Sequence, residues 1–255
     1  MSYEYINAIN ERGLGTITLN RPPVNIFNIA MMNEINYVLN EWKNDKNLKV
    51  LLFNANGKCF SAGVDVAEHM GDLAPKMIEC FHGMFRLIDS KDALTVSSVY
   101  GSCLGGGCEL AIFCDLAIAD DTAKFGQPEV QVGVLPPIAA WIMPRIIGRK
   151  AAFELILSGR IISAQEAANM GLINKSVASG SLPRETEEFV KPYLNLSAKI
   201  IEIIKKTIRA GLGDDFESSL KIIENIYLNE LMRTSDAQEG LKAFLEKRKP
   251  EWKNC

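Results

Sequence analysis

The 255-residue sequence contains only two histidines, His69 and His82, and none of its six cysteines belongs to a CxxC pair. Neither histidine has a nearby partner at metal-ligand spacing, and the sequence lacks HExxH, GxSxG and GK[ST] motifs. These absences argue against a zinc site, a serine-hydrolase nucleophile elbow and a phosphate-binding loop. Several cysteines lie in apolar surroundings, so we expect reduced thiols, with neither a disulfide framework nor a metal site.

The sequence also lacks a large excess of charge and any long hydrophobic run. Its formal net charge is -3, with acids and bases interspersed, so it has no basic stripe for a nucleic-acid backbone. Glu109, Asp115 and Asp120 interrupt the longest apolar stretch, and the N-terminus does not combine a basic region with an apolar one. We therefore expect a cytoplasmic protein that binds neither nucleic acid nor membranes.

What the sequence does contain is a large apolar fraction, 47%, which is enough for a sizeable core. Short runs rich in β-branched residues alternate with helical patterns, the first of which covers about residues 30–43. This alternation predicts an α/β fold. The predicted strands are residues 15–22, 49–55, 94–101 and 115–120.

A later helix has clear signals at both of its ends. Ser163 and Glu166 have the spacing of a capping box, in which a serine hydroxyl and a glutamate satisfy the first free N–H groups of a helix. Gly171 follows at the position where a helix commonly ends. These signals predict a short helix between residues 163 and 171.

From about Glu185 onward the pattern is helical only, and Ser235 and Gln238 have the spacing of another capping box. Helices with no strands to cover indicate a separate C-terminal layer, of a kind often used for subunit contacts. We therefore divide the chain into a core at 1–184 and a helical oligomerisation region at 185–255.

The stretch GSCLGGGCELAIFCD, at 101–115, places three glycines before an apolar segment that contains one acid, Glu109. The glycines do not have the spacing of a phosphate loop. A strand, a glycine turn and a helix instead offer free N–H groups beside the positive end of a helix dipole. Such a terminus can bind a developing oxyanion.

Glu109 has apolar neighbours on every side, so burial should raise its pKa and suit it to proton transfer. The alternative is a structural carboxylate that backbone groups satisfy. A second acid, Glu129, stands in another apolar segment, KFGQPEVQVG. Two such carboxylates beside an N–H donor site would suit the addition or removal of water across a polarised double bond.

Four segments, at 59–70, 100–119, 125–135 and 157–174, resemble in order the signatures of the enoyl-CoA hydratase/isomerase (crotonase) superfamily. The resemblance implies an α/β fold built as a spiral of repeated ββα units, with a C-terminal helical trimerisation region. It also implies an acyl-CoA thioester substrate and a homotrimer or homohexamer. No cofactor is implied, since CoA enters as part of the substrate.

The same resemblance assigns roles to individual positions. The backbone N–H groups of Val64 and Gly106 correspond to the family's oxyanion hole. Glu109 and Glu129 correspond to its catalytic pair, with Glu109 nearer to the water-activating role and Glu129 nearer to the acid. Ala62, Val64 and Val66 resemble positions that contact CoA, and packed loop residues are the alternative.

One segment departs from most hydratases of the family. The run VLPPIAAWIMPRIIG places Pro136, Pro137 and Trp141 close after Glu129, which should reshape the acyl pocket. Taken together with VNIF, VDVAEHM, FHGMF and the run at 227–252, this segment is similar to the family's cyclohexa-1,5-diene-1-carbonyl-CoA hydratases. Those enzymes act in anaerobic benzoyl-CoA degradation and form 6-hydroxycyclohex-1-ene-1-carbonyl-CoA. We expect that reaction. A short-chain 2-enoyl-CoA hydratase and a non-catalytic acyl-CoA-binding protein remain the alternatives.

Overall fold

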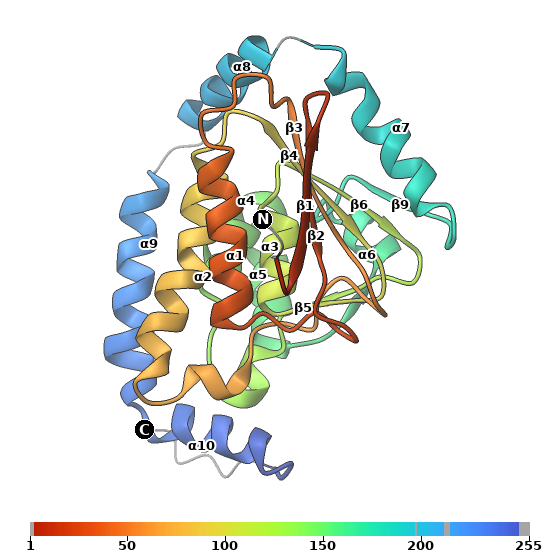
Figure 1. The fold of residues 1–255 in the computed structure, drawn as a ribbon. Coiled ribbons are helices and arrows are strands. Elements are labelled where there is room, and N and C mark those ends of the chain that lie inside the picture. The colour runs from red at the N-terminus through yellow and green to blue at the C-terminus, as the bar shows by residue number, and fades with distance from the viewer. Residues whose placement is uncertain (1–2, 197, 212–214, 250–255) are drawn as a thin grey trace.

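The computed structural model describes residues 3–196, 198–211 and 215–249. A six-stranded sheet runs through the molecule in the order β1-β2-β3-β4-β6-β9 (Figure 1). Strands β1 and β2 pair antiparallel, and every later pair in this sheet is parallel. The strands are β1 (Ile6–Glu11), β2 (Leu14–Leu19), β3 (Val50–Ala55), β4 (Leu94–Val99), β6 (Leu116–Asp120) and β9 (Lys175–Val177).

Both faces of this large sheet are covered by helices. Side chains alternate along a strand, so Leu51 and Phe53 of β3 enter the main core, while Val50 and Leu52 face the opposite side. There they pack with Val190 of α7, and α1 and α2 contribute to the main core on the other face (Figure 1). These helices are α1 (Ile29–Glu41), α2 (Leu73–Asp89) and α7 (Leu182–Leu194).

A second, three-stranded sheet has the order β5-β7-β8, and the chain visits it between visits to the large sheet. Strand β4 leads to β5 and α3, and strand β6 leads to β7, η2 and α4. This alternation confirms the expected spiral of ββα units. The elements are β5 (Ser102–Leu104), α3 (Gly106–Phe113), β7 (Lys124–Gly126), η2 (Pro128–Val132), α4 (Pro137–Ile146), α5 (Gly148–Ser158) and β8 (Ile162–Ser163).

The small sheet brings three distant segments to one edge. Strands β5 and β7 are parallel, and a parallel bridge joins Ser61 to Cys103 in β5. Because parallel strands end at the same edge, the segments that follow Ser61, β5 and β7 leave the sheet side by side. The three segments are 62–66, 105–109 and 127–132.

Most of the predicted elements are confirmed. The four predicted strands correspond to β2, β3, β4 and β6, and the first predicted helix corresponds to α1. Ser163 caps α6 (Ala164–Asn169), where its hydroxyl accepts a hydrogen bond from the backbone N–H of Glu166 at 3.2 Å. The Glu166 carboxylate does not complete the box, since it forms an ion pair with Arg160. Gly171 follows the helix with a φ of +80°.

The C-terminal helices differ from the expectation in two ways. Helix α7 begins at Leu182 and packs on the large sheet, so the expected boundary between residues 184 and 185 falls inside a core helix. The second expected capping box is wrong: Thr234, not Ser235, caps α10, and the Gln238 amide donates to the carbonyl of Met232. The later elements are α8 (Ala198–Gly211), α9 (Phe216–Asn225), the π-helical turn η3 (Ile226–Glu230), η4 (Leu231–Arg233) and α10 (Ser235–Leu245).

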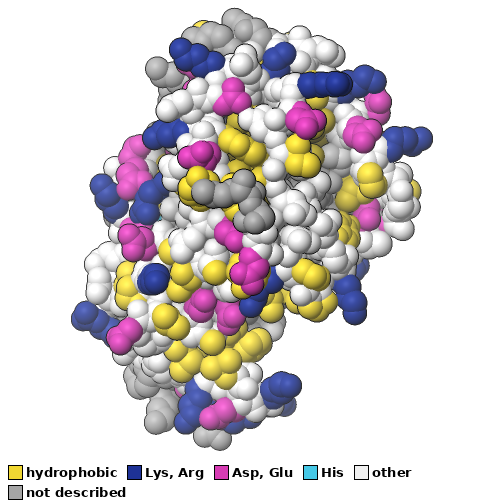
Figure 2. Space-filling view, in the orientation of Figure 1, with side chains coloured by type: hydrophobic (Ala, Val, Ile, Leu, Met, Phe, Trp, Pro, Cys, Tyr) yellow, Lys and Arg dark blue, Asp and Glu magenta, His cyan; other side chains and the backbone are white. Residues whose placement is uncertain are grey.

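Helix α10 lies at the end of the molecule farthest from α8 (Figure 1). Figure 2 shows hydrophobic side chains gathered on the lower part of this face, next to the lobe where α10 lies. In the part of the chain that the structure describes, no helix is both long enough and apolar enough to cross a bilayer.

Candidate active site

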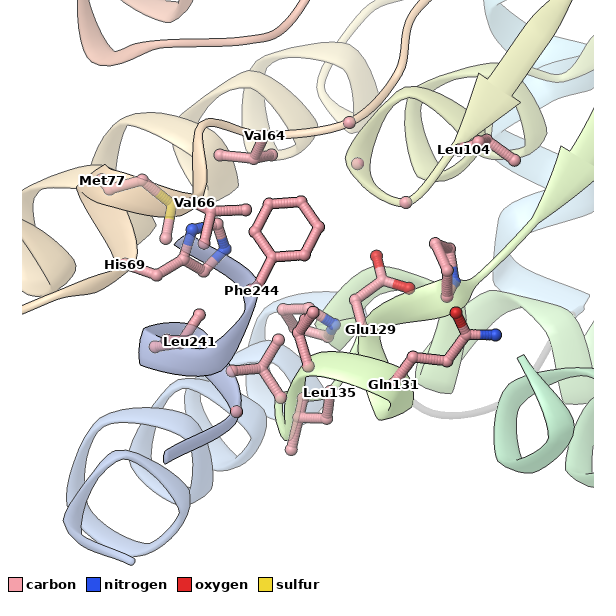
Figure 3. A pocket seen from close by; sticks show the side chains of 18 of the residues that line it. Val64, Val66, His69, Met77, Leu104, Glu129, Gln131, Leu135, Leu241 and Phe244 are labelled. Atoms are coloured by element: carbon pink, nitrogen blue, oxygen red, sulfur yellow. The ribbon is translucent and has the colours of Figure 1, made fainter. Parts of the chain in front are cut away.

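One cavity of about 430 Å³ lies where the three segments leave the small sheet. Val64 and Val66 reach it from the loop after Ser61, and Glu129 reaches it from η2 (Figure 3). Side chains of α10, among them Leu241 and Phe244, close the opposite side (Figure 3). The cavity therefore joins residues that lie far apart in the sequence.

The glycines at the start of α3 allow these segments to approach closely. Gly105 has a φ of +52°, and a Cβ there would lie 2.7 Å from Oε1 of Glu129. A Cβ on Gly106 would lie 2.5 Å from the Val64 side chain and 2.9 Å from Phe81. Any larger residue would therefore displace the backbone or the acid.

The backbone N–H of Val64 is left free by the way its loop is held. The backbone of Phe27 accepts from the N–H of Asp65 at 2.8 Å and donates to the carbonyl of Gly63 at 2.9 Å. In a parallel bridge of this kind the flanking residues make the bonds, so Val64 directs its own N–H away from Phe27. Among the described residues, this N–H has no protein acceptor.

Gly106 supplies a second free donor. It is the first residue of α3, and the first N–H groups of a helix have no acceptor inside the helix. No other described residue accepts from the Gly106 N–H. Because Gly106 lies against the Val64 side chain, the structure brings together the two residues that the sequence resemblance paired.

Glu109 is buried one turn into α3, and its side chain is 2% exposed. Its Oε1 accepts hydrogen bonds from the backbone N–H groups of Ile138 at 2.7 Å and Ala139 at 2.8 Å. These donors belong to the first turn of α4, so the Glu109 carboxylate caps a helix distant in sequence. The other oxygen, Oε2, has no hydrogen bond in the described part of the chain. Backbone groups therefore satisfy only one of the two oxygens, so a purely structural role does not account for the whole carboxylate.

Burial and hydrogen bonding shift the pKa of Glu109 in opposite directions. Desolvation raises its pKa, and the two N–H donors at the start of α4 lower it, with a net result of about 7. The acid is therefore divided between its two protonation states near neutral pH.

Glu129 lies at the start of η2 and is partly buried. Its pKa is raised well above the ordinary value, chiefly by desolvation and then by the negative charge of Glu109. With its amide nitrogen turned toward the acid, Gln127 lies 3.3 Å from both carboxylate oxygens. Burial and the charge of Glu109 thus favour the protonated form of Glu129, whereas a hydrogen bond from the Gln127 amide would favour the ionised form.

Residues 10–255 match the enoyl-CoA hydratase/isomerase family. The chain belongs to this family. It is 36% identical over 259 residues to a probable enoyl-CoA hydratase of Mycobacterium tuberculosis, covering 99% of each chain. It is 37% identical over 239 residues to a cyclohexa-1,5-dienecarbonyl-CoA hydratase of Thauera aromatica, covering 93% of this chain and 92% of that protein. The structure of an enoyl-CoA hydratase from Mycobacterium smegmatis matches with a TM-score of 0.78 at 30% identity, covering 98% of this chain and 99% of that chain.

In this member of the family, Ala62, Val64 and Val66 all line the cavity, as does Pro137. The expected place of Trp141 is wrong. Its ring packs against Phe113 at 6.2 Å and Phe216 at 4.9 Å between centroids, inside an aromatic cluster. The wall after Glu129 is instead formed by smaller apolar residues, namely Val132, Val134, Leu135 and Pro137.

Several polar residues of the cavity were not predicted from the sequence. His69 lines it and bonds through Nδ1 to the carbonyl of Asp65 at 2.9 Å, and burial lowers the pKa of the imidazole. Tyr227, from η3, lines it on the side of the C-terminal helices. Gln127, whose amide lies beside Glu129, could have been noticed because it directly precedes Pro128 and Glu129, whereas nothing in the sequence marks Tyr227.

Helix α10 packs tightly against the helical turn that carries Glu129. A Cβ on Gly240 would collide with the backbone carbonyl of Val132. The described residues contain no cluster of histidine, cysteine, aspartate or glutamate arranged to hold a metal ion. The polar lining of this cavity therefore consists of two free N–H groups, two carboxyl groups, a few neutral side chains and Arg248, which forms ion pairs with Glu239 and Glu246.

Replacing Glu109 by glutamine should stabilise the fold at high pH and have little effect at low pH. The folded-state pKa of about 7 lies above the ordinary value of 4.5, so burying the charged form costs stability as pH rises between these values. The amide of the glutamine would keep an oxygen for the α4 donors without the charge. We expect a gain of roughly 2–3 kcal/mol at pH 8 and almost none near pH 4.5.

Urea denaturation at one fixed protein concentration measures this difference. Glu154→Gln is the matched control, because Glu154 is exposed and Arg160 lowers its pKa, so the same substitution should not stabilise the protein at pH 8. Equal free energies of unfolding for Glu109→Gln and the wild type at both pH values would contradict the expected cost of burying ionised Glu109.

Proposed function

We propose that this protein is a hydratase that adds water to a conjugated acyl-CoA thioester. One observation carries the proposal: two carboxyl groups face one cavity beside two free backbone N–H groups. Hydration needs a proton acceptor, a proton donor and a stabilised oxyanion together. Family membership supports the same chemistry.

The thioester carbonyl oxygen accepts hydrogen bonds from the N–H groups of Val64 and Gly106. These bonds draw electron density from the conjugated double bond toward the oxygen, so the β-carbon becomes open to attack. Water forms a bond to this carbon, and the electron pair of the double bond moves to the thioester oxygen as an enolate. The same two N–H groups stabilise the negative charge.

Two proton transfers complete the addition. Ionised Glu109 accepts a proton from the attacking water, and protonated Glu129 donates a proton to carbon as the enolate collapses. The α4 donors support this division, because they favour the ionised form of Glu109, and the charge of Glu109 then disfavours the ionised form of Glu129. After both transfers one proton and one hydroxyl have been added.

The finer proposal for the substrate is cyclohexa-1,5-diene-1-carbonyl-CoA, with 6-hydroxycyclohex-1-ene-1-carbonyl-CoA as the product. Here the hydroxyl bonds to the β-carbon and the proton goes to the far end of the diene. The relative from Thauera aromatica, which is named for this substrate, supports the proposal. So does the apolar wall of Val134, Leu135 and Pro137, which suits a hydrocarbon ring.

A short-chain 2-enoyl-CoA is the second candidate substrate. A short-chain-enoyl-CoA hydratase of Clostridium acetobutylicum is 32% identical over 256 residues and supports it. In either case the CoA part belongs to the substrate, contacts Ala62, Val64 and Val66, and needs no further cofactor. A non-catalytic acyl-CoA-binding role is disfavoured because both carboxyl groups are present.

We also infer that the protein forms a homotrimer or homohexamer. Helix α8 exposes three isoleucines, Ile203, Ile204 and Ile208, each between 47% and 60%. An exposed apolar helix face of this kind is typical of a surface that a second subunit covers.

Glu109→Gln and Glu129→Gln should each lower turnover by roughly 100- to 10,000-fold, because each substitution removes one proton-transfer group. Binding of a saturated thioester such as butyryl-CoA should change little. Steady-state kinetics and calorimetry measure the two quantities, with Glu154→Gln as the surface control. A variant that retained more than about a third of wild-type turnover would remove that residue from its role.

The cyclic dienoyl thioester should be hydrated at least about 100-fold more efficiently than crotonyl-CoA, a difference of about 2.7 kcal/mol in transition-state binding. A planar ring is wider than a linear chain, and Glu129 must deliver its proton to the far end of the diene. Side-by-side kcat/KM values test this expectation. Equal values, or a preference for crotonyl-CoA, would favour the short-chain substrate.

Replacing Ile204 and Ile208 of α8 by lysine should lower the molecular mass in solution, because buried charges would oppose subunit contact. Light scattering on the wild type and the double variant measures the mass. Replacing the isolated exposed residue Ile9 by lysine controls for the loss of one surface isoleucine. A wild-type protein that is an active monomer would contradict the inference.

A further inference from the structure

Tyr227 is a buried residue with an unused hydroxyl. It belongs to the π-helical turn η3, between α9 and α10, and is 1% exposed. Its hydroxyl has no hydrogen-bond partner among the described residues, although the side chain lines the cavity. Leaving such a group unpaired costs about 1–3 kcal/mol, so a buried hydroxyl of this kind calls for a partner that the folded chain does not supply.

The surroundings of Tyr227 keep it a proton donor. Burial raises the pKa of the phenol, and the negative charges of Glu109 and Glu129 raise it further. The phenol therefore stays protonated throughout the pH range in which the two acids titrate. Its sensitivity to both charges also agrees with its place in the same cavity as the acids.

Three other polar side chains of the cavity have partners within the chain, among them Arg248, which forms ion pairs with Glu239 and Glu246. The Nδ1 atom of His69 bonds to the carbonyl of Asp65, and the Gln131 amide donates to the carbonyl of Gly159. Leu241 and Phe244 of α10, which line the same side of the cavity, are apolar. A polar atom of a bound molecule in this part of the cavity would therefore have the Tyr227 hydroxyl as a ready donor.

We propose that the Tyr227 hydroxyl donates a hydrogen bond to the oxygen atom that adds to the double bond. The proposal rests on the hydratase function and assigns it a further catalytic residue. A water molecule has two protons and two lone pairs. Its protons face the two carboxyl groups, one lone pair forms the bond to carbon, and the other is left to accept from Tyr227.

The same contact has a consequence for the reverse reaction. The oxygen that Tyr227 holds as water becomes the hydroxyl oxygen of the product, and the phenol keeps its own proton throughout. In dehydration the hydrogen bond then stabilises the hydroxyl as it leaves. Tyr227 should therefore favour a hydroxylated thioester over the same thioester without the hydroxyl, independently of turnover.

Tyr227→Phe removes the hydroxyl and keeps the ring in place. Steady-state kinetics should show kcat lowered by about tenfold or more in both directions, with the KM of the unsaturated thioester within about threefold of wild type. Tyr100→Phe is the matched control, because the Tyr100 hydroxyl bonds to the carbonyls of Ala55 and Gly57 and does not line the cavity.

Calorimetry then separates a contact with substrate from a purely structural effect. In a Glu129→Gln background, which suppresses turnover, the affinity ratio of 3-hydroxybutyryl-CoA to butyryl-CoA should fall about fivefold or more on Tyr227→Phe. Affinity for butyryl-CoA should not change. An unchanged ratio, or wild-type kcat in Tyr227→Phe, would overturn the assignment.

If the proposed hydratase function is wrong, the kinetic results will differ from those expected if only the role of Tyr227 is wrong. The wild-type protein would then turn over neither thioester, and Glu109→Gln would be indistinguishable from it. The binding ratio would still decide whether Tyr227 recognises the hydroxyl oxygen, because that measurement needs no turnover.

Discussion

The site depends on the parallel register of the small sheet. Ser61, β5 and β7 lie side by side and run in the same direction, so the chain leaves all three at one edge. That edge receives Val64, Gly106 and Glu129 from segments that lie far apart in the sequence. Strands of three residues could not hold this arrangement alone. Each is tied through the spiral to a longer strand of the large sheet, whose two faces are packed.

A second constraint is the burial of two acids in one apolar cavity. Two ionised carboxylates there would repel each other, and each would lose its hydration. The first turn of α4 resolves this conflict unequally, because its free N–H groups bond to Glu109 and give Glu129 no such help. The position at which α4 begins therefore favours ionisation of Glu109 over ionisation of Glu129.

Much of the fold and of the site could be predicted from the sequence, because the signals lie within short segments. Glu109 and Glu129 stand out because each is a charge within an apolar segment, and the glycines at 105–107 mark a close approach. The small sheet gave no usable pattern, since strands of two or three residues show no alternation. The place of Trp141 does not follow from the sequence, because its helix turns the ring toward Phe113 and Phe216, and helix orientation is a tertiary property.

Tyr227 shows most clearly where sequence reasoning ends, because its importance comes from a contact between distant parts of the chain. It lines the cavity from η3, while the following helix α10 packs against the turn that carries Glu129, where Gly240 leaves no space for a side chain. The C-terminal helices thus complete the wall of the site. A division into a core at 1–184 and an oligomerisation region at 185–255 does not separate chemistry from assembly, since a change that shifts these helices would also move the cavity wall.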